Sequence, residues 1–192
     1  MKFQNVALLA AAAMVQADNT ITFISQDVLD RTIYFTGNPG MPEIKPLWIE
    51  GFTNHTVDIP YGWVGNFFSV IDGDPIVPGM LGEFAFNSWG GMTYFDVSAI
   101  VNPNDWDGVK KIWPVDDPVP FSGCEIFPCN FAYYLPDDEQ TKATHKSDFF
   151  CTLGNVGFVD EDDIKPEPVQ KRDLLEDPTK HYARTAVEGR AE

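Results

Sequence analysis

The chain has 192 residues, of which 44% are hydrophobic and 14% aromatic, and its formal net charge is −16 at pH 7. This length and composition fit one domain with a sizeable core. The acidic balance excludes nucleic acid as a partner, because affinity for nucleic acid comes mainly from Lys and Arg that neutralise phosphates. The three histidines are scattered and no phosphate-binding loop or nucleophile elbow is found, so we expect neither a metal nor a cofactor.

The N-terminus has the parts of a signal peptide. Lys2 supplies the positive charge, residues 6–15 are apolar, and Val15 and Ala17 put small residues at the −3 and −1 positions of a cleavage site. The apolar run is too short to cross a bilayer of about 30 Å. We therefore expect residues 1–17 to be removed, and the protein to be secreted, extracellular or cell-wall associated, with no membrane span.

The next residues have the pattern of short β-strands. Runs rich in β-branched and aromatic residues alternate with segments rich in Gly, Pro, Asn and Asp. Residues 26–30 have the length of a hairpin connection between the first two runs. No amphipathic helix is indicated before residue 160. The fold class predicted is all-β, a sandwich or barrel, with strands at residues 20–24, 31–36, 54–59, 65–71, 81–87 and 92–100.

Two kinds of covalent modification are expected of an exported chain. Asn54 begins the one glycosylation sequon, in a polar context typical of a surface turn. Cys124, Cys129 and Cys151 meet an oxidising compartment, so we expect one disulfide and one leftover thiol. The spacing leaves all three pairings open. If Cys151 is bridged, its partner should be Cys124 or Cys129 of the same chain.

Four tryptophans lie in Gly-, Pro- or Asp-rich contexts: Trp63, Trp89, Trp106 and Trp113. Such residues either fill the core or its open ends, or present a flat ring to a sugar. Trp89, which precedes Gly90 and Gly91, is the best candidate for an exposed ring.

The composition changes after about residue 155. Residues 160–163 are all acidic, and the segment that follows has many charges and almost no aromatic residues. Such a segment buries too little apolar surface to offset the entropy of ordering. We therefore expect a folded domain at 18–154 and a charged, disordered tail at 155–192. Lys171 and Arg172 are either a dibasic processing site or two solvated charges.

Three blocks resemble thaumatin-like proteins, and more narrowly the small secreted thaumatin-like proteins of filamentous fungi, which have few cysteines. The blocks are MLGEFAFN at 80–87 with YFDVS at 94–98, CNFAYYLPDD at 129–138, and the opening strands at 20–35. The resemblance implies a β-sandwich with an acidic cleft. Glu83 and Asp96 match two of its acids, and Asp138 or its neighbour Asp137 matches the last. The remaining cleft positions differ: the middle aspartate falls on Val101, with Asn102 and Asp105 nearby, and the arginine falls near Asn66.

Three functions are compatible with these features. The favoured one is a monomeric cell-wall protein that binds β-glucan through Trp89 and the cleft residues, with roles in spore germination, wall remodelling, host adhesion or virulence. The second is a weak endo-β-1,3-glucanase in which Glu83 and Asp96 are catalytic, because a pair of carboxyl groups is the minimum machinery of most glycosidases. The third is a secreted effector that binds a host surface protein. We lean against catalysis.

Overall fold

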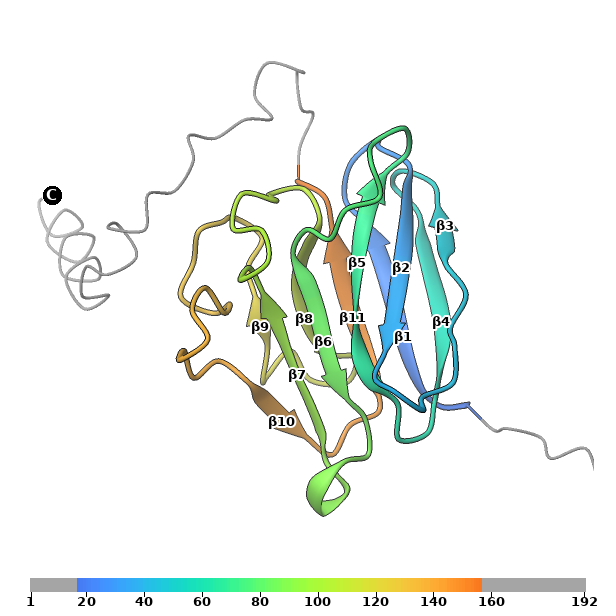
Figure 1. Ribbon diagram of the computed structural model, residues 1–192, viewed down its shortest axis with the longest axis vertical. Helices are drawn as coiled ribbons and strands as arrows, with labels where there is room; N and C mark the ends of the chain where they lie inside the picture. The colour runs from blue at the N-terminus through green and yellow to red at the C-terminus, as the bar shows by residue number, and fades with distance from the viewer. Residues whose placement is uncertain (1–16, 157–192) are drawn as a thin grey trace, which may run out of the picture.

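The computed structural model describes residues 17–156, which form two β-sheets packed face to face (Figure 1). The prediction of an all-β fold is confirmed, since the described residues hold eleven strands and a single 3-10 turn at Trp89–Gly91. Nearly all of the expected signal peptide and tail, including Lys171 and Arg172, lies outside the described residues.

One sheet has five strands and the other has six. The five-stranded sheet runs in the order β4 (Asn54–Pro60), β1 (Ala17–Ser25), β11 (Asp148–Leu153), β8 (Val109–Pro114) and β9 (Ser122–Gly123). The six-stranded sheet runs in the order β10 (Lys142–Thr144), β7 (Thr93–Ser98), β6 (Leu81–Ala85), β5 (Val64–Ile71), β2 (Arg31–Gly37) and β3 (Leu47–Ile49). Neighbouring strands are antiparallel except β1 and β11, which are parallel.

The expected hairpin between the first two strands is wrong. Residues 26–30 carry the chain from β1 in one sheet to β2 in the other, and Gln26 N–H donates to Leu153 O of β11 (2.9 Å). The turn at Pro60–Trp63 likewise joins β4 to β5 across the two sheets. A period-2 pattern identifies strands and their buried faces, but it does not say which sheet each strand joins.

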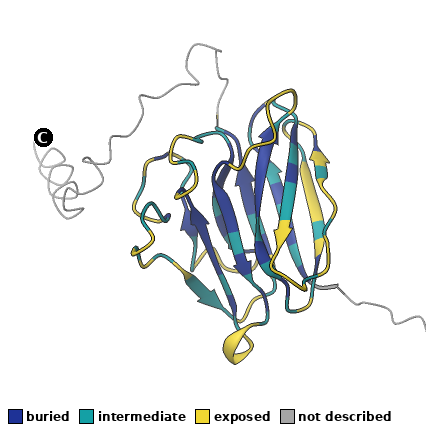
Figure 2. Ribbon diagram, viewed as in Figure 1, coloured by how far each residue is buried: buried dark blue, intermediate teal, exposed yellow. Residues whose placement is uncertain are grey.

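Aromatic rings fill the space between the sheets. Phe149 of β11 contacts Phe84 of β6 and Phe95 of β7 edge-to-face, with ring centroids 5.1 and 5.0 Å apart. Phe84 also stacks on Phe86 at 4.6 Å, and all four rings are buried. Buried residues are concentrated in the central strands of the two sheets, while much of the loops and parts of β3 and β4 are exposed (Figure 2). These contacts between the two sheets form the main hydrophobic core.

The alternation of side chains along each strand also determines which residues lie on the outer face of the six-stranded sheet. Successive strand residues point to opposite faces, so a buried Phe84 places Glu83 on the outer face. Phe95 is buried in the same way, which places Asp96 outward as well. The core residues therefore determine where these two acidic side chains lie.

Candidate functional site

Glu83 and Asp96 lie directly opposite each other on neighbouring antiparallel strands, β6 and β7. Asn66 of β5 pairs with Glu83 on its other side. Directly opposed residues have their Cβ atoms about 4.5–5.5 Å apart, so their side chains interact. The fold thus brings together two of the acids singled out in the sequence, with an amide where the thaumatin-like pattern has an arginine.

These residues form the floor of a shallow groove of about 270 Å³. Its walls include both apolar and polar side chains. The residues that line it are Asn38, Val64, Gly65, Asn66, Glu83, Phe84, Ala85, Tyr94, Asp96 and Thr141. The groove therefore offers several hydrogen-bond acceptors beside a small apolar wall.

Asp96 is an unusual residue for this groove because its side chain is acidic and yet the residue is only 9% exposed. Its Oδ2 accepts a hydrogen bond from Thr141 Oγ1 (3.3 Å), while Oδ1 has no hydrogen-bond partner among the described residues. Burial, and then the charge of Glu83, raise the pKa of Asp96 to about 7, against the opposing effects of Thr141 and Lys142. Near neutral pH Asp96 is therefore partly protonated.

The acidic pair at 137–138 lies elsewhere. Asp138 Oδ2 accepts hydrogen bonds from the N–H groups of Tyr134 (2.8 Å) and Leu135 (2.9 Å), so this carboxylate closes a turn. It lines a separate hollow of about 160 Å³ beside Cys129. Asp137 is exposed on the same turn. Neither residue is among those that line the groove, so the structure does not bring them to Glu83 and Asp96.

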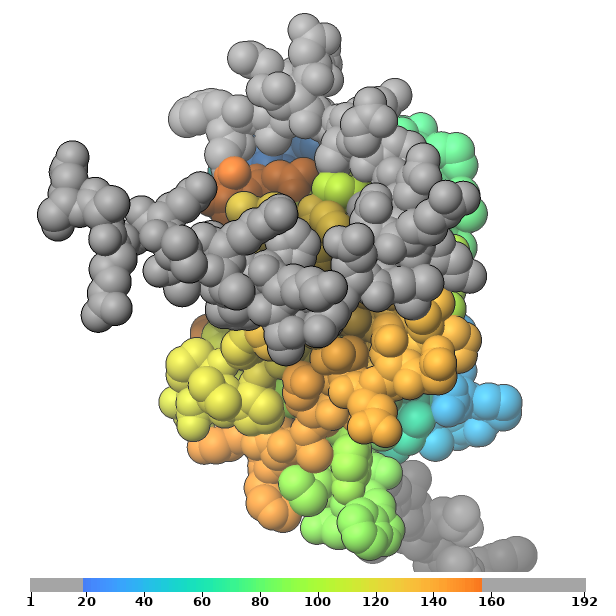
Figure 3. Space-filling view, turned by 90° about the vertical axis from the view of Figure 1, so that its left-hand side faces the viewer, coloured from blue at the N-terminus to red at the C-terminus, as the bar shows by residue number. Residues whose placement is uncertain are grey.

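Trp89 is 83% exposed at the turn between β6 and β7. The Tyr94 hydroxyl donates to Trp89 O (3.3 Å), and Tyr94 lines the groove, so the Trp89 turn stands at one end of it. Figure 3 shows the light-green β6–β7 turn projecting below the orange segment that contains β10. Trp63 is fully buried, whereas Trp106 and Trp113 are half-buried. Trp89 is therefore the tryptophan best placed to contact a partner.

A second set of acids lies in the loop between β7 and β8. Asp105 accepts hydrogen bonds from the N–H groups of Met80 and Gly108, and a Cβ at Gly79 or Gly108 would overlap its carboxyl group. Burial, together with the hydrogen bond and charge of Asp107, raises the pKa of Asp105 to about 7. Asp105 thus ties two loops together and lines a different hollow from the groove. Sequence patterns do not indicate this role, because one of the two partners, the Met80 N–H, is 25 residues away along the chain.

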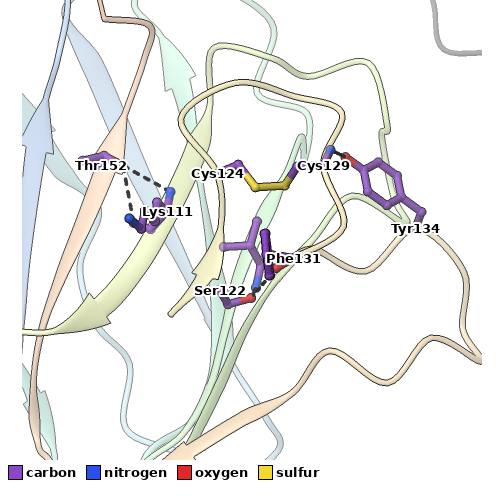
Figure 4. Close-up of a disulfide and its surroundings, with 8 residues drawn as sticks. Lys111, Ser122, Cys124, Cys129, Phe131, Tyr134 and Thr152 are labelled. Atoms are coloured by element: carbon purple, nitrogen blue, oxygen red, sulfur yellow. Dashed lines mark hydrogen bonds between the residues drawn. A yellow bond between two sulfur atoms is a disulfide. The ribbon is translucent and has the colours of Figure 1, made fainter. Parts of the chain in front are cut away.

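The disulfide joins Cys124 to Cys129, one of the three pairings that the spacing left open (Figure 4). Cys129 N–H donates to the Tyr134 hydroxyl (3.1 Å), which fixes the loop against the following segment. Cys151 is a free, buried thiol in β11, and burial with the charge of Glu125 raises its pKa well above the usual range. Asn54 is the first residue of β4 and is exposed, which is compatible with glycosylation. Glycosylation of Asn54 stays a prediction.

Two further findings concern the part of the chain that the structure describes. Residues 17–156 contain no group of three or more His, Cys, Asp or Glu side chains placed to hold a metal ion. No helix within them is long and apolar enough to cross a membrane.

Comparison with known proteins identifies one relative by sequence and one likeness by structure, although no family model matches the chain. The antigenic protein SchS21 of Stachybotrys chartarum is 53% identical over 135 residues, which cover 70% of this chain and 94% of that protein. The crystal structure of the protein elicitor MoHrip2 from Magnaporthe oryzae superposes with a TM-score of 0.53 over 71% of this chain and 98% of that one. Its sequence identity is 12%, so this likeness shows a shared fold alone.

These matches overturn the resemblance to thaumatin-like proteins. The blocks that carried it are short, and the structure explains them in other ways. Glu83 and Asp96 follow from strand alternation around a buried Phe84, and Asp138 closes a turn beside a local disulfide. A strand pattern and a turn pattern of this kind can occur in any sandwich, so their order along the chain was insufficient to identify a family.

Proposed function

This chain belongs to the family of the antigenic protein SchS21, and on that premise we propose that it is an exported protein that acts by being recognised by proteins of another organism. The observation that carries the proposal is the 53% identity across nearly the whole of that relative. The expected signal peptide at 1–17 supports export. The protein elicitor with a similar fold supports the proposal that a sandwich of this kind can have such a role.

The described surface supports recognition. Exposed aromatic side chains are enriched at protein interfaces, where they often contribute most of the binding energy. Trp89 presents its ring at the tip of a turn whose position is fixed by β6 and β7. The acidic groove begins beside it, through Tyr94. Together they offer a partner protein an apolar anchor next to a group of hydrogen-bond acceptors.

The comparisons give less support to glycoside hydrolysis. Neither SchS21 nor the protein elicitor is named as a glycosidase. Glu83 and Asp96 lie directly opposite each other on β6 and β7, and the charge of Glu83 is one of the causes of the raised Asp96 pKa. Most glycosidases require a pair of carboxyl groups, but such a pair is not by itself evidence of catalysis. Binding is therefore the better-supported use of this groove.

The experiment tests export and recognition in turn. The full chain is expressed in a eukaryotic secretory host, and the protein in the medium is analysed by N-terminal sequencing, with Asp18 expected as the first residue. The secreted protein is then tested for binding by antibodies raised against folded SchS21. Retention of the chain inside the cell would contradict export. Export without antibody binding, combined with release of sugar from β-glucan, would contradict recognition and restore the enzymatic interpretation.

A further inference from the structure

Three hydrogen-bond acceptors stand side by side across the outer face of the six-stranded sheet. Asn66, Glu83 and Asp96 come from the adjacent strands β5, β6 and β7, and each is directly opposite the next in the register. All three line the groove. The Oδ1 atom of Asp96 has no hydrogen-bond partner within the described residues, although the side chain is nine-tenths buried. The groove thus has unused acceptor capacity.

The groove also has an excess of negative charge. Of the ion pairs formed within residues 17–156, one joins Arg31 to Asp27 and the other joins Lys146 to Asp116. Neither involves Glu83 or Asp96. Lys142 of β10 is the basic residue whose charge acts on Asp96, and its effect is the smallest of those that shift this group. The two carboxyl groups are therefore left to repel each other, and this repulsion is relieved when Asp96 is protonated.

We infer that the groove binds a primary ammonium group, held between Glu83 and Asp96 with Asn66 as the third acceptor. An ammonium carries three N–H donors and one positive charge, which match three acceptors and offset the repulsion between the carboxylates. Val64 and Ala85, which also line the groove, provide an apolar wall for the alkyl chain that carries the ammonium. This inference does not depend on the proposed function.

Other ligands match the groove less well. A divalent metal ion would need more oxygen ligands than two carboxylates supply, and the described residues hold no group of three or more His, Cys, Asp or Glu side chains placed to bind one. A neutral sugar could donate hydrogen bonds but would leave the repulsion between the carboxylates in place. A planar guanidinium would pair best with one carboxylate edge. The compact ammonium is the group whose shape and charge fit the pair.

An ammonium binds best when Asp96 is ionised, so where Asp96 is protonated, binding releases its proton to the solvent. Affinity should therefore rise with pH as Asp96 loses its proton. The groups that face Asp96 are Glu83 on β6, Thr141 and Lys142 at β10, and Tyr94 on its own strand. Of these, Glu83 opposes ionisation of Asp96, while Thr141 and Lys142 favour it.

The test is calorimetric titration of the folded protein with butylammonium at pH 6 and pH 8. We expect binding about tenfold tighter at pH 8, because Asp96 changes from mostly protonated to mostly ionised across its pKa of about 7. The ligand keeps its charge throughout, since alkylammonium groups lose their proton near pH ~10.4. Proton release should appear as a dependence of the measured heat on the ionisation enthalpy of the buffer.

Variants locate the site. Asp96→Asn should abolish the pH dependence and weaken binding at pH 8 at least about tenfold, the gain expected from ionisation of Asp96. Glu83→Gln should also weaken binding at pH 8 but should leave a pH dependence, because burial is the largest cause of the raised Asp96 pKa. Asp116→Asn, which removes an exposed carboxylate away from the groove, is the matched control and should bind like the wild type. Circular dichroism on each variant separates loss of the site from loss of the fold. Equal affinity of the wild type and a folded Asp96→Asn protein would overturn the inference, as would an affinity that does not change with pH.

A last comparison identifies the source of the ammonium. The peptide acetyl-Gly-Lys-Gly-amide is titrated beside butylammonium and beside the same peptide with acetyllysine. Tighter binding of the lysine peptide assigns the site to a lysine of a partner protein, and equal binding assigns it to a free amine. Both results support the inference. Binding of the acetyllysine peptide as tight as that of the lysine peptide would contradict it, because the charge would then be irrelevant.

Discussion

Asp27 and Arg31 form a buried, two-pronged ion pair at the point where the chain crosses from one sheet to the other. Arg31 Nη1 donates to Asp27 Oδ1 (2.6 Å) and Nη2 donates to Oδ2 (2.8 Å). Asp27 Oδ2 also accepts from Asn155 N–H (3.0 Å), near the end of the described residues. One carboxylate thus links the first sheet crossing to the last part of the domain.

Loss of one partner in this pair should be strongly destabilising. Asp27→Asn leaves the Arg31 charge buried without a counter-charge, and breaking a buried pair costs about 3–5 kcal/mol. Urea unfolding should show this decrease in the free energy of unfolding. The exposed pair of Lys146 and Asp116 is the control, since Asp116→Asn should change stability by less than about 1 kcal/mol. Equal effects of the two substitutions would contradict the structural role of Asp27.

The same pair predicts a loss of stability in acid. Burial alone would raise the pKa of Asp27, but the hydrogen bond and charge of Arg31 and the backbone donors outweigh it and hold the pKa below 3.8. The folded state therefore binds this proton less readily than the unfolded state. The stabilisation is complete above pH 3.8 and is lost as pH falls through the folded pKa. Asp27→Asn should remove this part of the acid transition in a series of urea titrations.

Asp96 and Asp105 predict the opposite dependence at higher pH. Burial raises the pKa of each from 3.8 to about 7, so between these values the folded state holds protons that the unfolded state releases. Stability should therefore fall as pH rises from 4 to 7 and level off above 7. Asp96→Asn should reduce the fall by about 1–4 kcal/mol, because each unit of pKa shift corresponds to about 1.4 kcal/mol. A pH profile identical to that of the wild type would show that Asp96 ionises normally.

The cysteines predict a simple result in thiol labelling. Cys124 and Cys129 are joined, and Cys151 is buried with a raised pKa, so the folded protein should react with no equivalent of a thiol reagent. Unfolding without reductant should expose one thiol. Peptide mapping should place the label on Cys151. A disulfide-linked dimer, or labelling of Cys124 or Cys129, would show that another pairing forms.

Substitution of an exposed and of a buried aromatic residue by alanine should have very different effects on the free energy of unfolding. Trp89→Ala should change the free energy of unfolding by less than about 0.5 kcal/mol, because the ring is exposed. Phe149→Ala should cost about 3–5 kcal/mol, because this ring is buried between the two sheets. Thermal unfolding followed by circular dichroism compares the two. A large loss of stability in the Trp89 variant would mean that the turn contributes to the core.

The sequence predicted local structure better than long-range arrangement. Alternation located β5, β6 and β7 and placed Glu83 and Asp96 on neighbouring strands, since strand period and spacing are local properties. It did not predict that residues 26–30 cross between sheets, because that depends on contacts with β11. The structural role of Asp105 was also missed, since its partners include the backbone of Met80, far along the chain. The resemblance to thaumatin-like proteins is wrong because short blocks of strand and turn sequence are not evidence of common descent.

The most direct test of the proposed function is competition for antibodies raised against folded SchS21. Increasing amounts of this chain, either folded or reduced and unfolded, are added while binding of the antibodies to immobilised SchS21 is measured. We expect the folded chain to displace a large fraction of the antibodies and the unfolded chain to displace much less, because the shared surface depends on the sandwich. The absence of competition by the folded chain would contradict the claim that the family relationship extends to a recognised surface.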